Sequence, residues 1–187
     1  MASRRLVAML RAVNVGGHSS LPMAELRKLT TDLGHRDVTT YIQSGNVVFT
    51  TDKPSGTVAA RGRIANELSD AIADRKGLQV PVMVRTEPEL RAALDAMPFL
   101  DDEANSSKLM IVFLSDAPTK AAIASLDHER FAPDRFEVVG REMFVHFPNG
   151  AGRSKFTPSY FKRLGAEGTA RNLNTVRKLA DLAAASP

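Results

Sequence analysis

The sequence predicts an α+β protein of two related subdomains, the first of them ferredoxin-like: a βαββαβ antiparallel sheet with helices on one face. Three observations lead to this prediction. Residues 5–14 form a nearly continuous apolar run, as a strand covered on both sides requires. Two helical patterns follow it, at 23–33 and 56–76. Each half of the chain also contains a two-residue hairpin signal, Ser44-Gly45 and Gly140-Arg141.

The first subdomain is predicted over residues 1–97. Leucines recur at helical spacing in its first helix, and Gly34 and Gly77 are suited to end its two long helices. The expected elements are strand 5–14, helix 23–33, strands 38–43 and 46–50, helix 56–76, strand 80–84 and a short helix 87–97.

A polar, acidic connector is predicted at residues 98–107, and a second subdomain at 108–187. This half repeats the βαββ order and adds C-terminal helices. The expected elements are strand 108–114, helix 119–126, strands 136–139 and 142–147, and helices 158–164 and 172–184.

The composition is that of a soluble globular protein, with 43% hydrophobic and 25% charged residues among 187. No apolar run is long enough to span a bilayer, so we expect no membrane partner. The absence of Cys excludes disulfides, thiolate catalysis and Cys-ligated metals, and it fits a cytoplasmic protein.

The positive charge lies in the tail. Residues 153–187 contain 7 basic and 2 acidic residues, whereas residues 1–152 contain 18 basic and 19 acidic residues. The whole net charge of +4 therefore comes from the last segment. Such a segment attracts phosphates, carboxylates or nucleic-acid backbones.

Polar side chains follow the first predicted strand. Arg11 lies near its end, where a guanidinium must either pair with a carboxylate or face a cleft. Asn14, Gly16 and Gly17 begin a strand–loop–helix connection, which can present backbone N–H groups to an anion. A plain tight turn is the alternative, because the sequence contains neither G-x-G-x-x-G nor a Walker loop.

The predicted turn Gln43-Ser44-Gly45-Asn46 groups three polar side chains. Ser and Asn in turns usually hydrogen-bond to local backbone groups, which is the structural interpretation. Gln43 adds a long amide that a hairpin does not need, so Gln43, Ser44 and Asn46 are candidate ligand-binding residues. The expected strand order places this turn beside Asn14.

Two clusters in the tail could bind an anion. Arg153, Ser154 and Lys155 offer a guanidinium, a hydroxyl and an ammonium within three residues. Arg171 and Asn172 lie at the predicted start of the last helix, where free N–H groups favour anions. Charged residues that merely solvate the surface are the alternative for both clusters.

Catalytic and metal-binding patterns are not found. The four His residues lack ligand spacing, and without Cys a zinc site is not expected. Only His18 has a loop position suited to a general base. The sequence predicts no cofactor and no metal, and it leaves open whether the protein is an enzyme.

Six segments occur in order along nearly the whole chain: Leu10–Gly17, Pro22–Leu26, Tyr41–Phe49, Val82–Thr86, Gly152–Lys155 and Ala170–Val176. Together they resemble the bacterial domain-of-unknown-function family 1697. The resemblance implies an α+β fold with two subdomains, the first ferredoxin-like, and it implies no activity. In relatives the loop after the double Gly often carries Lys, whereas this chain has His18-Ser19-Ser20.

We expect the protein to bind a small anionic, phosphorylated or nucleotide-like ligand in a cleft between the subdomains. One alternative is RNA or DNA binding through the basic C-terminal segment, although 6% aromatic residues and no Trp disfavour a base-stacking surface. A non-catalytic interaction module is the other. The oligomeric state is not indicated. The expected ligand-binding residues are Arg11, Asn14, Gly16, Gly17, Gln43, Ser44, Asn46, Arg153, Ser154, Lys155, Arg171 and Asn172.

Overall fold

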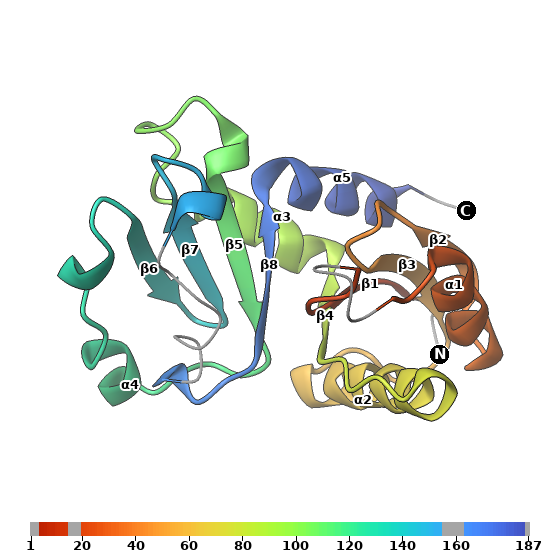
Figure 1. Cartoon of the computed structure of the whole chain (residues 1–187). Helices are drawn as coiled ribbons and strands as arrows, with labels where there is room; N and C mark the ends of the chain where they lie inside the picture. The colour runs from red at the N-terminus through yellow and green to blue at the C-terminus, as the bar shows by residue number, and fades with distance from the viewer. Residues whose placement is uncertain (1–3, 15–19, 155–162, 186–187) are drawn as a thin grey trace. The chain divides into compact units, whose positions relative to one another are not determined.

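The computed structural model describes residues 4–14, 20–154 and 163–185 (Figure 1). Within these ranges, eight strands form two four-stranded antiparallel sheets, accompanied by five α-helices. This confirms an α+β fold with two subdomains. The chain divides into two compact units, Met1–Arg91 with Lys178–Pro187 and Ala92–Arg177. The predicted connector, residues 98–107, lies within the second unit.

The first unit contains the predicted strands and helices, with ends that move by a few residues. Its sheet has the order β2-β3-β1-β4, and every neighbouring pair is antiparallel. The elements are β1 (Arg4–Leu10), α1 (Met23–Asp32), β2 (Arg36–Thr40), β3 (Asn46–Thr51), α2 (Val58–Lys76) and β4 (Val82–Thr86).

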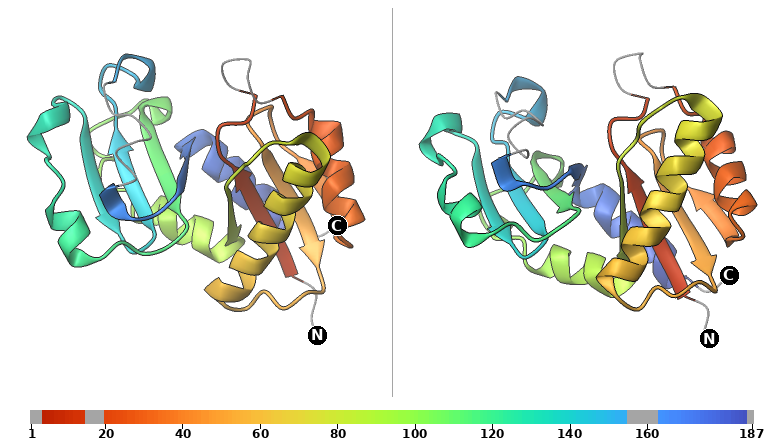
Figure 2. Two further views of the ribbon diagram at one scale, coloured as in Figure 1. Left: turned by 60° about the horizontal axis from the view of Figure 1, so that its bottom comes forward. Right: turned by 90° about the horizontal axis from the view of Figure 1, so that it is seen from below.

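Strand β1 is central and buried on both faces, as the apolar run predicts. Leu6, Ala8 and Leu10 belong to one core cluster with residues of α1 and α2, which therefore cover the same face of the sheet (Figure 2). Val7 and Met9 alternate with them and point to the opposite face. All five side chains have 0% exposure, so a polar substitution at any of them removes apolar burial.

Helix α2 begins and ends where its sequence provides caps. The Thr57 hydroxyl accepts a hydrogen bond from Ala60 N at 3.1 Å, and Gly77 ends the helix with φ +66°. The Thr57 cap joins the loop of residues 52–57, between β3 and α2, to the first turn of a 19-residue helix.

Helix α3 (Glu87–Asp95) follows β4, and α5 (Leu173–Ala184) follows β8. The divisions between the two units fall inside these two helices.

The second unit has the sheet order β6-β7-β5-β8, again antiparallel throughout. Strand β8 was not predicted: residues 170–172 end this strand, and the helix that follows begins only at Leu173. The predicted helix 158–164 lies largely outside the described residues. The elements are β5 (Leu109–Leu114), α4 (Lys120–Ala124), β6 (Arg135–Val139), β7 (Glu142–His146) and β8 (Gly168–Asn172).

Candidate anion-binding site

Asn14 joins the end of β1 to the β2–β3 turn. Its Nδ2 donates to the carbonyl of Gln43 at 2.7 Å and to that of Leu21 at 2.9 Å, and its Oδ1 accepts from Leu21 N at 2.8 Å. The predicted closeness of Asn14 and the turn is therefore confirmed. The amide is fully occupied in holding these segments together.

Asn46 and Gly45 shape the same turn from within. Asn46 has 0% exposure, and its Nδ2 donates to the carbonyl of Tyr41 at 3.0 Å and to Ser44 Oγ at 3.1 Å. A Cβ on Gly45, where φ is +77°, would collide with the side chains of Val13 and Leu10. Asn46 thus hydrogen-bonds to polar groups of its own turn, as expected if its role is structural.

Three non-glycine residues around this junction have left-handed backbone: Ala12 (φ +54°), Asn14 (φ +56°) and Ile42 (φ +49°). This conformation is costly for a β-branched residue such as Ile42. The hydrogen bonds of Asn14 and Asn46 hold it in place. Gln43 is exposed, whereas Ser44 and Arg11 are half-buried, so the junction presents few free polar groups.

Arg171 is buried in β8, with 7% exposure. Its Nη1 donates to Thr169 Oγ1 and to the carbonyl of Ala170, both at 2.8 Å. Burial lowers the pKa of its guanidinium to about 10. Asn172 caps α5, since its Oδ1 accepts from Thr175 N at 2.9 Å. Arg171 therefore does not belong to an exposed basic patch.

Arg153 and Ser154 line a small cavity in the second unit, with a volume of about 230 Å³. The Ser154 hydroxyl donates to Asp134 Oδ2 at 2.5 Å, and Arg153 is exposed. Gly16, Gly17 and Lys155 lie outside the described residues. The gathering of all twelve predicted residues into one cleft remains a prediction.

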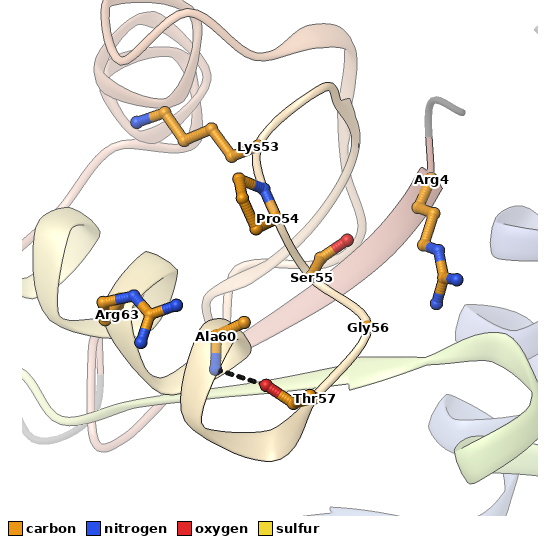
Figure 3. A pocket seen from close by; sticks show the side chains of 8 residues that line it. All are labelled: Arg4, Lys53, Pro54, Ser55, Gly56, Thr57, Ala60 and Arg63. Carbon is orange, nitrogen blue, oxygen red and sulfur yellow. Dashed lines mark hydrogen bonds between the residues drawn. The ribbon is translucent and has the colours of Figure 1, made fainter. Parts of the chain in front are cut away.

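A larger pocket lies in the first unit, beside the start of α2 (Figure 3). Its volume is about 540 Å³, in the range of small-ligand sites. The described lining includes three cationic side chains and no carboxylate. It consists of Arg4, Lys53, Pro54, Ser55, Gly56, Thr57, Ala60 and Arg63.

The three cations differ in how they are paired. Lys53 Nζ forms an ion pair with Glu67 Oε2 at 2.5 Å. No described residue pairs with the guanidinium of Arg4 or Arg63. Arg4 extends beside Gly56, whose Cβ position would lie 3.7–3.9 Å from the guanidinium atoms. Two guanidinium groups thus flank the pocket without a counter-ion from the described chain (Figure 3).

The helix itself adds positive potential to this pocket. Thr57 caps Ala60 N, but the N–H groups of Val58 and Ala59 have no acceptor within the helix. The aligned peptide dipoles place about half a positive charge at this end. The neighbouring acid, Asp52, is engaged elsewhere, because both its oxygens accept from Arg36 Nη2 at 2.9 Å.

Ser55 lies in the lining with only 4% exposure. Its carbonyl accepts from Arg61 Nη1 at 2.8 Å, and Arg61 is held in turn by Glu89 at 2.6 Å. No described residue hydrogen-bonds to the Ser55 hydroxyl. In Figure 3 this hydroxyl lies on the side of the loop toward Arg4. The loop therefore presents to the pocket a hydroxyl with which no described residue forms a hydrogen bond.

Sequence reasoning missed this pocket. Arg4 belongs to a strand, Arg63 to a helix and Lys53 to a loop, and no local pattern joins them. The usable signal was the run Lys53-Pro-Ser-Gly-Thr between a strand and a long helix.

Two further searches gave negative results within the described ranges. No three His, Asp or Glu side chains gather into a group that could hold a metal ion. No helix there is long and apolar enough to cross a membrane.

Comparison with known proteins identifies the family. Residues 3–144 match the family described as "Protein of unknown function (DUF1697)", and the chain belongs to it. The fold is similar to that of the conserved bacterial protein SP0830 from Streptococcus pneumoniae, with a TM-score of 0.69 and 22% identity. The alignment covers 97% of this chain and 99% of that one. No functionally curated protein matches the sequence.

Proposed function

We propose that this member of the DUF1697 family binds a small anionic ligand in the pocket beside the start of α2. One observation carries the proposal: the guanidinium groups of Arg4 and Arg63 flank a 540 Å³ pocket whose described lining contains no acid. Guanidinium groups bind phosphate and carboxylate oxygens through charge-assisted hydrogen bonds. Open N–H groups at a helix start favour the same ligands.

Electrostatics supports an anion over a neutral ligand. Arg4 and Arg63 are exposed, so each keeps its hydration while the pocket is empty, and their mutual repulsion is screened by salt. A bound anion replaces that repulsion with attraction to both groups and to the helix dipole. We therefore expect binding that weakens as ionic strength rises.

The proposal is tested by titrating ¹⁵N-labelled protein with inorganic phosphate at low salt. The amide signals of Val58 and Ala59 should shift, because their N–H groups have no acceptor within the helix. The variant Arg63→Ala should lose most of the affinity. Arg75→Ala is the matched control, since Arg75 lies on the same helix but approaches Asp32 at 3.6 Å.

The same titration separates this pocket from the site predicted from the sequence. Arg171→Ala should leave phosphate affinity unchanged if the α2 pocket binds the anion. Loss of affinity in Arg171→Ala, with none in Arg63→Ala, would assign binding to the C-terminal clusters instead. No shift at Val58 and Ala59 in the wild type would refute the pocket.

We also infer that the first unit follows the ferredoxin-like plan. The βαββαβ element order and the sheet order β2-β3-β1-β4 support this inference.

A further inference from the structure

The polar side chains in the described lining of the α2 pocket are mostly hydrogen-bond donors. Arg4, Lys53 and Arg63 donate and cannot accept. The Thr57 oxygen already accepts from Ala60 N. No carboxylate, side-chain amide or aromatic ring contributes to the described lining. A ligand that fits this set must therefore be rich in acceptors and does not need a base or sugar to be recognised.

We infer that the pocket takes an oligophosphate, a chain of two or more linked phosphate groups, in a form free of divalent cations. The inference rests on the proposed anion-binding function and names the ligand class of that site. Four features of the pocket support it: its charge, its volume, the lack of a carboxylate in the described lining and the Ser55 hydroxyl.

Charge favours more than one phosphate. The pair between Lys53 and Glu67 is nearly neutral, which leaves Arg4, Arg63 and the helix start. Together they amount to roughly 2.5 positive charges. A single phosphate group supplies about 1.5–2 negative charges near neutral pH. A second linked phosphate supplies the rest.

Volume agrees with charge. At ~30 Å³ per water, a pocket of 540 Å³ corresponds to about 18 waters. One tetrahedral phosphate, with four oxygens, fills only a fraction of that space. The cations are also distributed along it: Arg63 lies five residues beyond Val58 on α2, which is about 7.5 Å along the helix axis.

The described lining contains no carboxylate that could hold a divalent cation. Magnesium in phosphate sites is bound by one or two carboxylates together with the phosphate oxygens. Asp52 is the acid adjacent to the loop, and its carboxylate is engaged by Arg36. Magnesium bound to the ligand would cancel the charge that the pocket recognises, so the two should compete.

The Ser55 hydroxyl is an independent sign of a ligand. Ser55 has 4% exposure as a residue, and its hydroxyl has no described partner. A phosphate oxygen in the pocket would accept its hydrogen. The structural role of Ser55 is performed by its carbonyl, which accepts from Arg61, so the side chain is free to serve a ligand.

Calorimetric titration of the whole protein at low salt tests the inference. The probes are inorganic phosphate, pyrophosphate, triphosphate and ATP, each with and without Mg²⁺. Pyrophosphate and triphosphate should bind at least tenfold more tightly than phosphate. ATP should bind within about threefold of triphosphate, because the described lining has no ring to stack on its base. Mg²⁺ should weaken each oligophosphate at least fivefold.

Two variants locate the effect. Ser55→Ala should lower triphosphate affinity about fivefold while leaving the melting temperature of the ligand-free protein unchanged or raised. Arg63→Ala should remove the preference for triphosphate over phosphate. Arg75→Ala should behave as the wild type.

Any other result of the titrations would contradict a specific part of the inference. Equal binding of phosphate and triphosphate would overturn the oligophosphate and leave the anion site standing. ATP binding far more tightly than triphosphate, or tightening with Mg²⁺, would replace the oligophosphate with a nucleotide. Binding only of long oligonucleotides, lost steeply with salt, would replace it with a nucleic acid. No binding of any anion would overturn the proposed function as well.

Discussion

Each of the two sheets buries an arginine at an equivalent position, but the surroundings of the two guanidinium groups differ. In the first unit Arg85 pairs across β4 and β1 with Val7, and in the second Arg171 pairs across β8 and β5 with Ile111. Each is the fourth residue of a five-residue strand, and a helix begins two residues later. The exposed fractions are 1% and 7%.

The difference lies in the chemistry around each guanidinium. Arg85 Nη1 donates to the carbonyl of Val84 at 3.2 Å, and its charge is the smallest of the influences that lower the pKa of the Glu89 carboxyl. Burial opposes the lowering, but the Thr86 N–H and the charge of Arg61 outweigh it. Arg171 donates to the Thr169 hydroxyl and to the Ala170 carbonyl, and burial lowers its own pKa. In the first sheet a carboxylate thus lies within electrostatic reach of the buried cation, whereas in the second sheet burial is the main influence on the guanidinium.

Substitution of the two buried arginines tests this difference directly and should have the largest effect on stability. Arg85→Met should lower the free energy of unfolding by about 2 kcal/mol, because it removes the donor to the Val84 carbonyl and one of the cations near the half-buried Glu89. Arg171→Met should change it by no more than about 1 kcal/mol, since an apolar side chain removes the cost of burying the guanidinium. Urea denaturation measures both.

A double-mutant cycle with Glu89→Gln sharpens the result. Arg85→Met and Glu89→Gln should couple by at least about 0.5 kcal/mol, and Arg171→Met should be additive with Glu89→Gln. Equal losses from the two Arg substitutions would mean that the acid does not distinguish the sites.

The residues that precede the edge strands give the next contrast. Asp134, before β6, accepts from Ser154, whereas neither ring nitrogen of His35, before β2, has a described partner. His35 stacks on Phe49 at 4.4 Å between ring centroids. Burial, assisted by the charge of Lys53, lowers its pKa to about 4.

His35 should therefore make the protein sensitive to mild acid. Between an unfolded pKa near 6.5 and the folded value near 4, the unfolded state binds the proton and the folded state does not. The free energy of unfolding therefore decreases as the pH is lowered, by about 2 kcal/mol between pH 7 and pH 5. His35→Phe should remove that part of the pH dependence in urea titrations at the two pH values. An unchanged slope in the variant would assign it to other groups.

The smallest expected effect on stability concerns Asn172, the cap that follows Arg171 at the start of α5. Asn172→Ala should cost about 1 kcal/mol, because Thr175 N loses its acceptor at the start of α5. Asn172→Ser should recover most of it, since Ser is also a good N-cap. Thermal unfolding of the three proteins tests this order, and equal stability of the wild type and Asn172→Ala would show that the cap contributes nothing.

Much of the fold could be predicted because its signals are local. The apolar run of β1, the hairpin turns and the capping residues of α2 act within a few neighbouring residues. Strand β8 was missed because its five residues, Gly168–Asn172, include Gly and Arg and lack the apolar alternation of a strand. It is identified only by its pairing with β5.

The candidate site was predictable only in part, for a similar reason. Asn14 and the turn of residues 43–46 meet because sheet order brings them together, and that order follows from the pattern. Whether an arginine is buried like Arg171 or exposed like Arg63 depends on tertiary packing, which charge and spacing do not encode. The pocket at α2 depends on that distinction.

The first unit is discontinuous, and this affects its synthesis on the ribosome. It includes residues 178–187, where the Leu182 carbonyl accepts from Arg5 Nε at 3.0 Å and Asp181 binds Arg91 at 2.9 Å. The nascent chain must extend through residues 92–177 before these contacts can form. At ~5–20 residues per second, the first 91 residues wait roughly 4–17 s for the rest of their unit. During that interval the growing polypeptide carries an incomplete N-terminal unit, the kind of partly folded species that is prone to aggregate.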